Sequence, residues 1–177
     1  MLSEFKLDLA FASKIESSHS FCRWVLDQTK FKELSNEAIL LREEQIALKP
    51  KKKPENWWRH WWCRLDDGTE SETDIFLVFG FPNSDKRIAL HIEDKLSYGE
   101  FTPNQYINYD RRAQFMANKK EFMNYSGYTT ILLAPEKFFA DNVRRINHFE
   151  CHISYESVAE VIPEFAQSLA EARNESN

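Results

Sequence analysis

The chain has 177 residues, a formal net charge of −5 and a hydrophobic fraction of 42%. That length fits about one domain and that composition is typical of a globular protein, while the net acidity disfavours a generic nucleic-acid coat protein. The longest apolar runs, such as Ile75 to Phe79, fall far short of the roughly 20 residues that a membrane-spanning helix needs, so we expect no membrane span.

The N-terminal part of the chain is predicted to be helical. Apolar residues recur three or four positions apart from Leu7 to Leu26, which predicts one amphipathic helix. Ser35 to Ala38 resembles the cap of a second, short helix over 38–48. A basic connector flanked by prolines, Lys49 to Pro54, follows it. This connector is either a solvated loop or a loop that contacts phosphate.

The segment from Trp57 to Trp62 contains four tryptophans in six residues, at the start of a predicted strand. Strand alternation places Trp58, His60 and Trp62 on one face and Trp57, Trp61 and Cys63 on the other. At least two of the tryptophans are expected in the core, because large aromatic side chains are mostly buried. The alternative roles for this segment are base stacking and contact with a partner protein.

The rest of the chain alternates strands and helices. A loop over 65–71 leads to a fully apolar strand over 75–79, and a turn over 81–85 leads to a strand over 87–95, which predicts a hairpin. Thr102 as cap and Pro103 in the first turn predict a helix that runs to about residue 119. The remaining predicted elements are a strand over 128–133, a helix over 136–140, a strand over 149–153 and a helix over 155–172, with a frayed polar tail over 173–177. This order predicts one α/β domain over 1–177, with a central mixed β-sheet flanked by helices.

The predicted strand over 87–95 ends in three consecutive charged residues, Glu93, Asp94 and Lys95. By alternation Glu93 and Lys95 share one face of the strand, and Asp94 points to the other. Removing an unpaired charge from water costs several kcal/mol, so charges at the end of an apolar strand need a reason. Either the strand has reached solvent, or the acid binds a metal and the lysine lies beside a reacting phosphate.

A further carboxylate, Asp74, precedes the neighbouring apolar strand. In a hairpin the start of one strand lies beside the end of the next, so Asp74 is expected to meet Glu93 and Lys95 at one edge of the sheet. Two carboxylates and a lysine there form a hard-oxygen site suited to Mg²⁺ or Mn²⁺.

These residues resemble the PD-(D/E)XK nuclease superfamily, in which an Asp on one strand precedes an acid-x-Lys on the next. Here the pattern reads Glu72-Thr73-Asp74 and then Glu93-Asp94-Lys95. A wider resemblance to small, stand-alone bacterial members of the superfamily covers residues 1 to 160, in collinear order. Its motifs are Ser18 to Trp24 (SHSFCRW), Ala89 to Lys95 (ALHIEDK), Phe101 to Tyr109 (FTPNQYINY), Thr130 to Pro135 (TILLAP) and Ile153 to Glu156 (ISYE).

The resemblance implies a restriction-endonuclease-like core and metal-dependent hydrolysis of phosphodiester bonds, with DNA as the expected substrate and Mg²⁺ or Mn²⁺ as the cofactor. It implies that Asp74 and Glu93 bind the metal and that the backbone carbonyl of Asp94 completes its shell. Lys95 would orient or activate the attacking water, and the Gln105 amide would hold Lys95 or a phosphate oxygen. An acid on the first helix often assists in this superfamily, and the candidates here are Asp8, Glu4 and Glu16.

The chain departs from the family pattern at three positions. Thr73 replaces the proline expected before the first acid, and Asp94 replaces a common asparagine. His91 stands where the family often has an apolar residue, on the same face as Glu93. It is either a hydrogen-bonded histidine below the site or an additional ligand or proton carrier.

Two further functions compete with a nuclease. One is a catalytically silent module that binds nucleic acid or protein, and the other is a partner subunit that uses the tryptophan-rich segment as its contact. A homodimer or an accessory protein is also compatible with the sequence. Three widely spaced cysteines without a C-x-x-C motif indicate a reducing, cytoplasmic compartment. A substrate would have to be held by local basic residues, and each of these is individually more typical of a solvated surface charge than of a phosphate contact: Lys49 to Lys53, Arg111-Arg112, Lys119-Lys120 and Arg144-Arg145.

Overall fold

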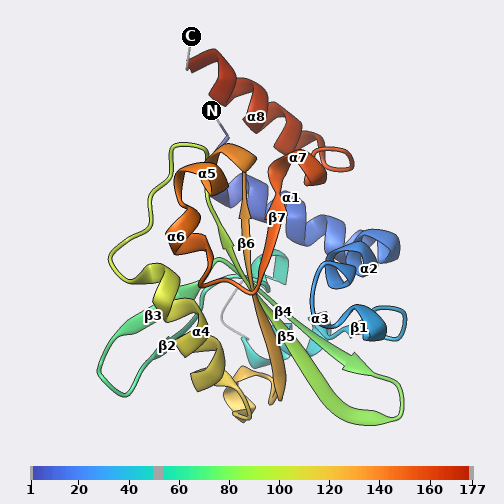
Figure 1. Ribbon diagram of the computed structural model, residues 1–177. Helices are drawn as coiled ribbons and strands as arrows, with labels where there is room; N and C mark the ends of the chain where they lie inside the picture. The colour runs from blue at the N-terminus through green and yellow to red at the C-terminus, as the bar shows by residue number, and fades with distance from the viewer. Residues whose placement is uncertain (1, 50–53, 176–177) are drawn as a thin grey trace.

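A five-stranded β-sheet forms the centre of the molecule (Figure 1). The structure is a computed structural model that describes residues 2–49 and 54–175. The strands lie in the order β1 (Ile39–Leu40), β4 (Ile75–Phe81), β5 (Ser84–Asp94), β6 (Gly127–Ala134) and β7 (Cys151–Ser154). β1, β4 and β5 pair antiparallel, whereas β5, β6 and β7 pair parallel. The sheet is therefore mixed, as predicted.

Helices cover both faces of the sheet, which confirms the predicted α/β class (Figure 1). One face carries α1 (Glu4–Ser17), α2 (His19–Asp27), α7 (Tyr155–Val158) and α8 (Pro163–Glu175). The other carries α4 (Gln105–Met116), α5 (Glu136–Asp141) and α6 (Val143–Ile146). The other described helical segments are α3 (Arg42–Leu48) and three short 3₁₀ turns, Lys32–Leu34, Pro54–Asn56 and Lys120–Phe122.

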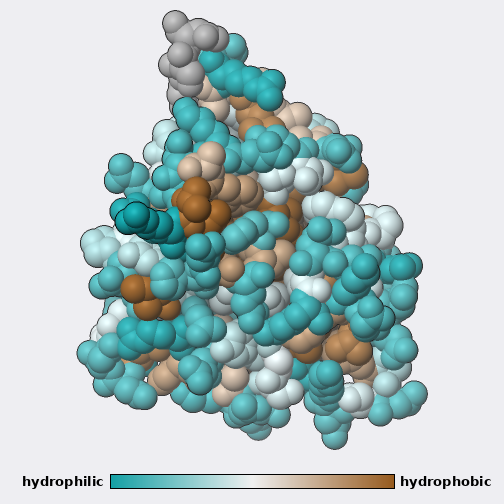
Figure 2. Space-filling model, viewed as in Figure 1, coloured by the Kyte–Doolittle hydropathy of each residue, from teal (hydrophilic) through white to brown (hydrophobic). Residues whose placement is uncertain are grey.

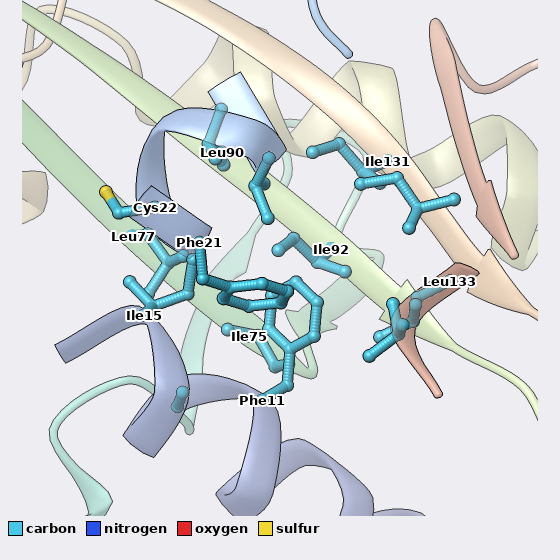
Figure 3. Close-up of a cluster of buried hydrophobic side chains, with 14 of the residues drawn as sticks. Phe11, Ile15, Phe21, Cys22, Ile75, Leu77, Leu90, Ile92, Ile131 and Leu133 are labelled. Atoms are coloured by element: carbon cyan, nitrogen blue, oxygen red, sulfur yellow. The ribbon is translucent and has the colours of Figure 1, made fainter. Parts of the chain in front are cut away.

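The largest hydrophobic cluster lies between the sheet and the α1–α2 pair (Figure 3). Alternate residues of β4 and β5 point into it, because β-strand side chains alternate between faces. Phe11 and Phe21 bring their rings within 5.3 Å, edge to face, and so join α1 to α2. Figure 3 shows these rings facing Ile75, Ile92 and Leu133. This packing fixes α1 across the sheet and carries its N-terminal acids toward the end of β5.

At the outer edge of β4, a side chain makes backbone hydrogen bonds that a neighbouring strand would otherwise make. β1 pairs only with Phe79 and Gly80, at the far end of β4. Nearer the start of β4, the fully buried Gln45 of α3 (Arg42–Leu48) replaces a neighbouring strand. Its Nε2 donates to the Phe76 carbonyl at 3.1 Å, and its Oε1 accepts from the Val78 N–H at 3.0 Å. One amide thus satisfies two buried backbone groups that would otherwise each cost about 1–3 kcal/mol.

A separate two-stranded hairpin, β2 (Trp61–Arg64) and β3 (Glu70–Thr73), precedes β4. It is fastened to α4 by Arg112, whose Nη1 donates to the Ser71 hydroxyl at 2.9 Å and the Glu72 carbonyl at 2.5 Å. Arg112 is only 1% exposed. The prediction that Arg112 belongs to a basic surface for substrate is therefore wrong, because this cation clamps the hairpin.

Two predicted helices are each divided in two. The helix expected over 7–26 breaks at Ser18, whose backbone is extended and whose hydroxyl accepts from the Phe21 N–H at 3.2 Å. The helix expected over 155–172 divides into α7 and α8, with Pro163 as the first residue of α8. Proline is well accommodated there, because the first N–H of a helix has no intrahelical partner. α8 continues to Glu175, into the segment predicted as a frayed tail.

Two other predicted helices begin or end at different residues in the structure. The segment predicted as a helix over 38–48 begins with β1, and only Arg42–Leu48 is helical. α4 begins at Gln105, after Asn104 in a left-handed conformation (φ 62°), so Thr102 is not its cap. It ends at Met116, before the predicted residue 119. The basic connector, interpreted from sequence as either a solvated loop or a loop that contacts phosphate, has residues 50–53 outside the described part of the chain.

Within the described ranges, no helix combines the length and apolar character that crossing a bilayer requires. All three cysteines, Cys22, Cys63 and Cys151, are free thiols and buried.

Candidate active site

The residues predicted to form a site meet where β4 begins and β5 ends. Ile75 of β4 stands opposite Ile92 of β5, which brings Asp74 beside the end of β5. The Asp74 Oδ2 accepts a hydrogen bond from the Asp94 N–H at 3.0 Å. α1 flanks this place on one face of the sheet and α4 flanks it on the other. The hairpin therefore brings together Asp74, Glu93 and Lys95 as the sequence predicted.

Glu93 is fully buried and forms the centre of this cluster. Its Oε1 accepts from the Gln105 Nε2 at 2.5 Å and forms an ion pair with the Lys95 Nζ. Its Oε2 is buried without a hydrogen-bond partner among the described residues. Burial and the neighbouring Asp74 carboxylate raise the pKa of Glu93 well above its usual value, although Lys95 opposes that shift. Glu93 thus has one oxygen available to a cation.

Lys95 supplies the positive charge of the cluster and is only 7% exposed. Burial by itself lowers the pKa of its ammonium group, but the carboxylates of Glu93, Asp74 and Glu4 outweigh burial and leave the pKa raised. Lys95 therefore stays charged at neutral pH, beside the carboxylate that it neutralises.

Gln105 and Tyr109 reach the cluster from successive turns of α4. The Gln105 Oε1 accepts from the Thr102 N–H at 3.0 Å, which leaves its Nε2 directed at Glu93. Gln105 thus faces the site as predicted, and its partner is Glu93 rather than Lys95. The Tyr109 hydroxyl donates to the Ile92 carbonyl at 3.2 Å and accepts from the Asp74 N–H at 3.3 Å. The sequence signal for Tyr109 was its spacing of four from Gln105, which puts both on one helix face.

Replacing Tyr109 by phenylalanine is expected to destabilise the protein by about 1 kcal/mol, because the Ile92 carbonyl and the Asp74 N–H both lose their hydroxyl partner. Urea denaturation at neutral pH measures this difference. Tyr106→Phe is the matched control, since Tyr106 lies on the same helix and its hydroxyl has no hydrogen bond in the described part of the chain. Equal stability of the two variants would contradict a positioning role for the Tyr109 hydroxyl.

Two of the three candidate acids on α1 face the cluster. Asp8 is 5% exposed, and burial, followed by the charges of Asp94 and Asp74, raises its pKa well above the usual value. Glu4 is half-buried, and burial is the main reason that its pKa is raised. Glu16 is excluded from the site, because its carboxylate binds the Arg42 guanidinium at 2.7 Å and the Trp57 indole N–H at 3.3 Å.

Asp94 points to the opposite face of β5 from Glu93, as alternation predicts. It is fully buried, and its Oδ1 accepts from the Tyr155 hydroxyl at 2.5 Å. Burial raises the pKa of Asp94 well above its usual value. The Asp8 and Asp94 carboxyls lie against each other, so Asp94 joins the acids of α1 below the site. Sequence reasoning did not identify Tyr155, although it lies in the ISYE segment.

His91 lies deeper in the same strand, in the position of a core residue. It is fully buried, and its Nε2 lies 3.0 Å from the Tyr125 hydroxyl. That hydroxyl donates to the Ala113 carbonyl, so it accepts a hydrogen bond from the Nε2–H of His91. Burial lowers its pKa well below the usual value, and Arg112 adds to the effect. Of the two roles open from the sequence, this favours the histidine below the site.

The donor chemistry of the cluster suits a hard cation. Carboxylate oxygens are the ligands that Mg²⁺ and Mn²⁺ prefer, and the Glu93 Oε2 is buried without a partner. Across the described residues, however, no three His, Cys, Asp or Glu side chains are already arranged as ligands around one point. The reason is visible in the hydrogen bonds, since Lys95 and Gln105 hold one Glu93 oxygen and the Asp94 N–H holds the Asp74 Oδ2.

Comparison of the chain with protein-family models, with curated proteins and with solved structures gives no match. The membership of the PD-(D/E)XK superfamily thus stays a prediction from the motifs, and the geometry of Asp74, Glu93, Lys95 and Gln105 is the structural indication of function.

Proposed function

We propose that this protein is a metal-dependent nuclease of the PD-(D/E)XK type, which hydrolyses phosphodiester bonds with DNA as the expected substrate. The observation that carries the proposal is the convergence of Asp74, Glu93 and Lys95 at one edge of the sheet, with both Glu93 and Lys95 buried. Buried charges are costly, and strongly shifted pKa values cluster at functional sites. A purely structural role would not need two buried charges, with Asp74 beside them, at the end of an apolar hairpin.

Asp74 and Glu93 would hold Mg²⁺ or Mn²⁺, with Asp8 as the additional acid on α1. A divalent ion bound there supplies two effects, a lower pKa for a bound water and stabilisation of the leaving oxygen. The carboxyls of Asp8 and Glu93 have pKa values raised by burial and by neighbouring acids, so the site favours a cation that compensates their charge.

The role proposed for Lys95 is to stabilise the negative charge that develops on the phosphate. A compact ammonium group fixed in a buried site is effective there, because it needs no reorganisation during the reaction. Gln105 orients the Glu93 carboxylate through its 2.5 Å hydrogen bond. The Tyr109 hydroxyl orients the backbone of Asp74 by accepting a hydrogen bond from its N–H.

The experiment that tests the proposal is a cleavage assay on plasmid, linear duplex and single-stranded DNA and on RNA, with Mg²⁺ or Mn²⁺. Wild-type protein is expected to cleave at least one substrate, and Asp74→Ala is expected to abolish the cleavage. Asp141→Ala, at an exposed position of α5, is the matched control and is expected to cleave normally. The proposal fails if every substrate stays intact at enzyme excess.

A second candidate function is a catalytically silent module that binds nucleic acid or protein. The observation that favours it is the Lys95 ammonium paired with Glu93, together with the lack of a prearranged ligand group in the described ranges. Titration with Mn²⁺ separates the two functions, since the silent module has no affinity for the ion. For either function, we infer a reducing, cytoplasmic compartment from the three free cysteines.

A further inference from the structure

Trp62 is the exposed member of the tryptophan-rich segment. Its exposed fraction is 56%, whereas Trp57, Trp58 and Trp61 are buried. In the described part of the chain its ring has no stacking partner and its indole N–H has no hydrogen bond. An open hollow of about 510 Å³ beside the ring is lined by Trp62, Glu70, Ser71 and Glu72. On the face shown in Figure 2, hydrophobic residues form small separate patches among hydrophilic ones.

The position of Trp62 relates it directly to the proposed active site. Trp62 pairs with Glu72, which precedes Asp74 by two residues. Two residues of extended chain span about 7 Å, and paired Cα atoms lie about 5 Å apart across antiparallel strands. The ring of Trp62 is therefore within reach of a base whose phosphate lies at Asp74.

The packing of the hairpin fixes the backbone at Trp62. The neighbouring Trp61 packs on Phe76 of β4 with 4.9 Å between ring centroids, and its indole N–H donates to the Trp57 carbonyl at 2.9 Å. Arg112 fastens the opposite strand to α4 through the Glu72 carbonyl. A backbone fixed before binding leaves only the side-chain torsions of Trp62 to be ordered when a ligand stacks on it.

A cation, Arg59, precedes Trp62 by three residues and packs on aromatic rings. Its guanidinium carbon is 4.5 Å from the centroid of the Phe5 ring and 5.7 Å from that of Trp58. Phe5 follows Glu4, and the charges of Lys95 and Asp74 shift the pKa of the Glu4 carboxyl. Phe5 is therefore next in sequence to a residue that lies close to the proposed active site. No carboxylate lies within ion-pair distance of Arg59 in residues 2–49 and 54–175. A stacked guanidinium without an acidic partner is well suited to bind a phosphate.

The other charges around Trp62 are paired. The Glu72 carboxylate lies 2.7 Å from the His60 Nδ1, and the Glu70 carboxylate lies 2.6 Å from the Arg64 guanidinium. The Arg64 guanidinium therefore offsets the charge of Glu70, and the His60 ring holds the Glu72 carboxylate by a hydrogen bond. What remains is an aromatic platform and one cation, the combination by which proteins bind single-stranded nucleic acids.

We propose that the substrate of this site is a single-stranded nucleic acid, with one base stacked on Trp62 and the adjoining phosphate bound by Arg59. The inference rests on the proposed nuclease function and adds the form of the substrate. In a duplex the bases stack on one another and leave no face for Trp62, whereas a single strand offers one at every nucleotide.

The test measures the binding of a labelled single-stranded oligonucleotide, as DNA and as RNA, and of the same sequence as a duplex. Ca²⁺ replaces Mg²⁺ so that the strand is not cleaved. The single strand is expected to bind more tightly than the duplex. Trp62→Ala is expected to weaken single-strand binding by roughly 5- to 100-fold. Trp62→Phe keeps a ring and is expected to retain most of the affinity. Arg59→Ala is expected to reduce the slope of log affinity against log salt by about 0.7, the value for one phosphate contact on a single strand.

Two matched controls come from the far end of the sheet. Ile39 is 54% exposed and pairs with Gly80, six residues along β4 from Asp74, which is about 20 Å of strand. Lys86 is an exposed cation near the start of β5. Ile39→Ala and Lys86→Ala are expected to leave the affinity unchanged, because neither side chain lies near Trp62.

Three results overturn the inference, and they differ in what they say about the nuclease. The first is equal affinity for single strand and duplex, with Trp62→Ala still binding normally and cleaving duplex. This result refutes the single-strand inference but not the proposed nuclease function. The second is a protein that cleaves nucleic acid but uses Trp62 to bind a basic peptide. This result also refutes the single-strand inference without refuting the nuclease function. Wild-type protein that neither binds nor cleaves any nucleic acid refutes both.

Discussion

Replacing Lys95 by methionine is expected to lower the cleavage rate by about 10²- to 10⁴-fold. Methionine keeps the length and apolar stem of the side chain and removes its charge. The phosphate then loses the cation that offsets its developing charge. Steady-state cleavage of the preferred substrate at saturating Mn²⁺ measures the effect.

The same substitution is expected to weaken metal binding at neutral pH. Lys95 opposes the rise in the pKa of the buried Glu93, so its removal leaves that pKa higher still. A ligand must be deprotonated to bind a metal, and a smaller fraction of Glu93 is then ionised. Raising the pH is expected to restore Mn²⁺ affinity in Lys95→Met more than it restores the rate, which separates the two roles of this lysine.

The chain offers a matched control in Lys30, which pairs with Glu150 at 2.8 Å on the surface. Both side chains of that pair are about half exposed, so Lys30→Met is expected to change stability by less than about 1 kcal/mol and activity not at all. A Lys95→Met variant that cleaves as fast as Lys30→Met would remove Lys95 from the catalytic machinery.

The sheet was the part of the fold most readily predicted from sequence. β4 and the inner half of β5 are buried on both faces, so each appears as an apolar run bounded by turn residues. The short turn between them makes the pair a hairpin and brings Asp74 beside Glu93. Alternation then separates Glu93 and Lys95 from Asp94. The position of the site follows from these local rules alone.

The helix breaks were not predictable in this way. The apolar period of α1 continues through Ser18 into α2, and the sequence there contains neither glycine nor proline. The break comes from packing, because Phe11 and Phe21 meet edge to face when the chain turns at Ser18. β1 was also missed, since it consists of two residues and exists only through its contact with β4.

Three groups that support the site lie too far away in sequence for a local rule to find. Tyr109 bonds Asp74 across 35 positions, Arg112 bonds Glu72 across 40 and Tyr155 bonds Asp94 across 61. Each depends on how a helix packs against a strand. Spacing could group Tyr109 with Gln105 on one face of α4, but it could not name the backbone atoms that the hydroxyl meets.

The buried acids Asp8 and Asp94 lead to an expected result for stability. Asp8 Oδ1 and Asp94 Oδ2 are both buried and have no donor among the described residues. Two carboxylates cannot share a site when both are ionised, and a single proton between them satisfies both oxygens. Burial and the neighbouring charges hold the pKa of each acid well above its usual value. The folded protein therefore retains a proton that the unfolded chain releases.

The sign of the pH dependence follows from that retained proton. The stability that it contributes is fully present below the unfolded pKa of about 3.9 and is lost as the pH rises through the folded pKa values. Asp8→Asn removes one ionisation and keeps a hydrogen-bond donor for Asp94. It is expected to stabilise the metal-free protein by about 1–3 kcal/mol at pH 8, which is about 3–10 °C in Tm, and by almost nothing at pH 4.

Thermal denaturation of both proteins in a chelator, over a series of pH values, measures this difference. Asp141→Asn, at an exposed position, is the control and is expected to follow wild type throughout. A difference between Asp8→Asn and wild type that stays constant with pH would contradict the shared proton. Excess Mg²⁺ extends the test, because an ion held partly by Asp8 stabilises wild type more than the variant. Asp8→Asn is expected to be more stable than wild type without Mg²⁺ and to gain less stability when Mg²⁺ is added. That pair of results would mean that Asp8 contributes to metal binding and lowers the stability of the metal-free fold.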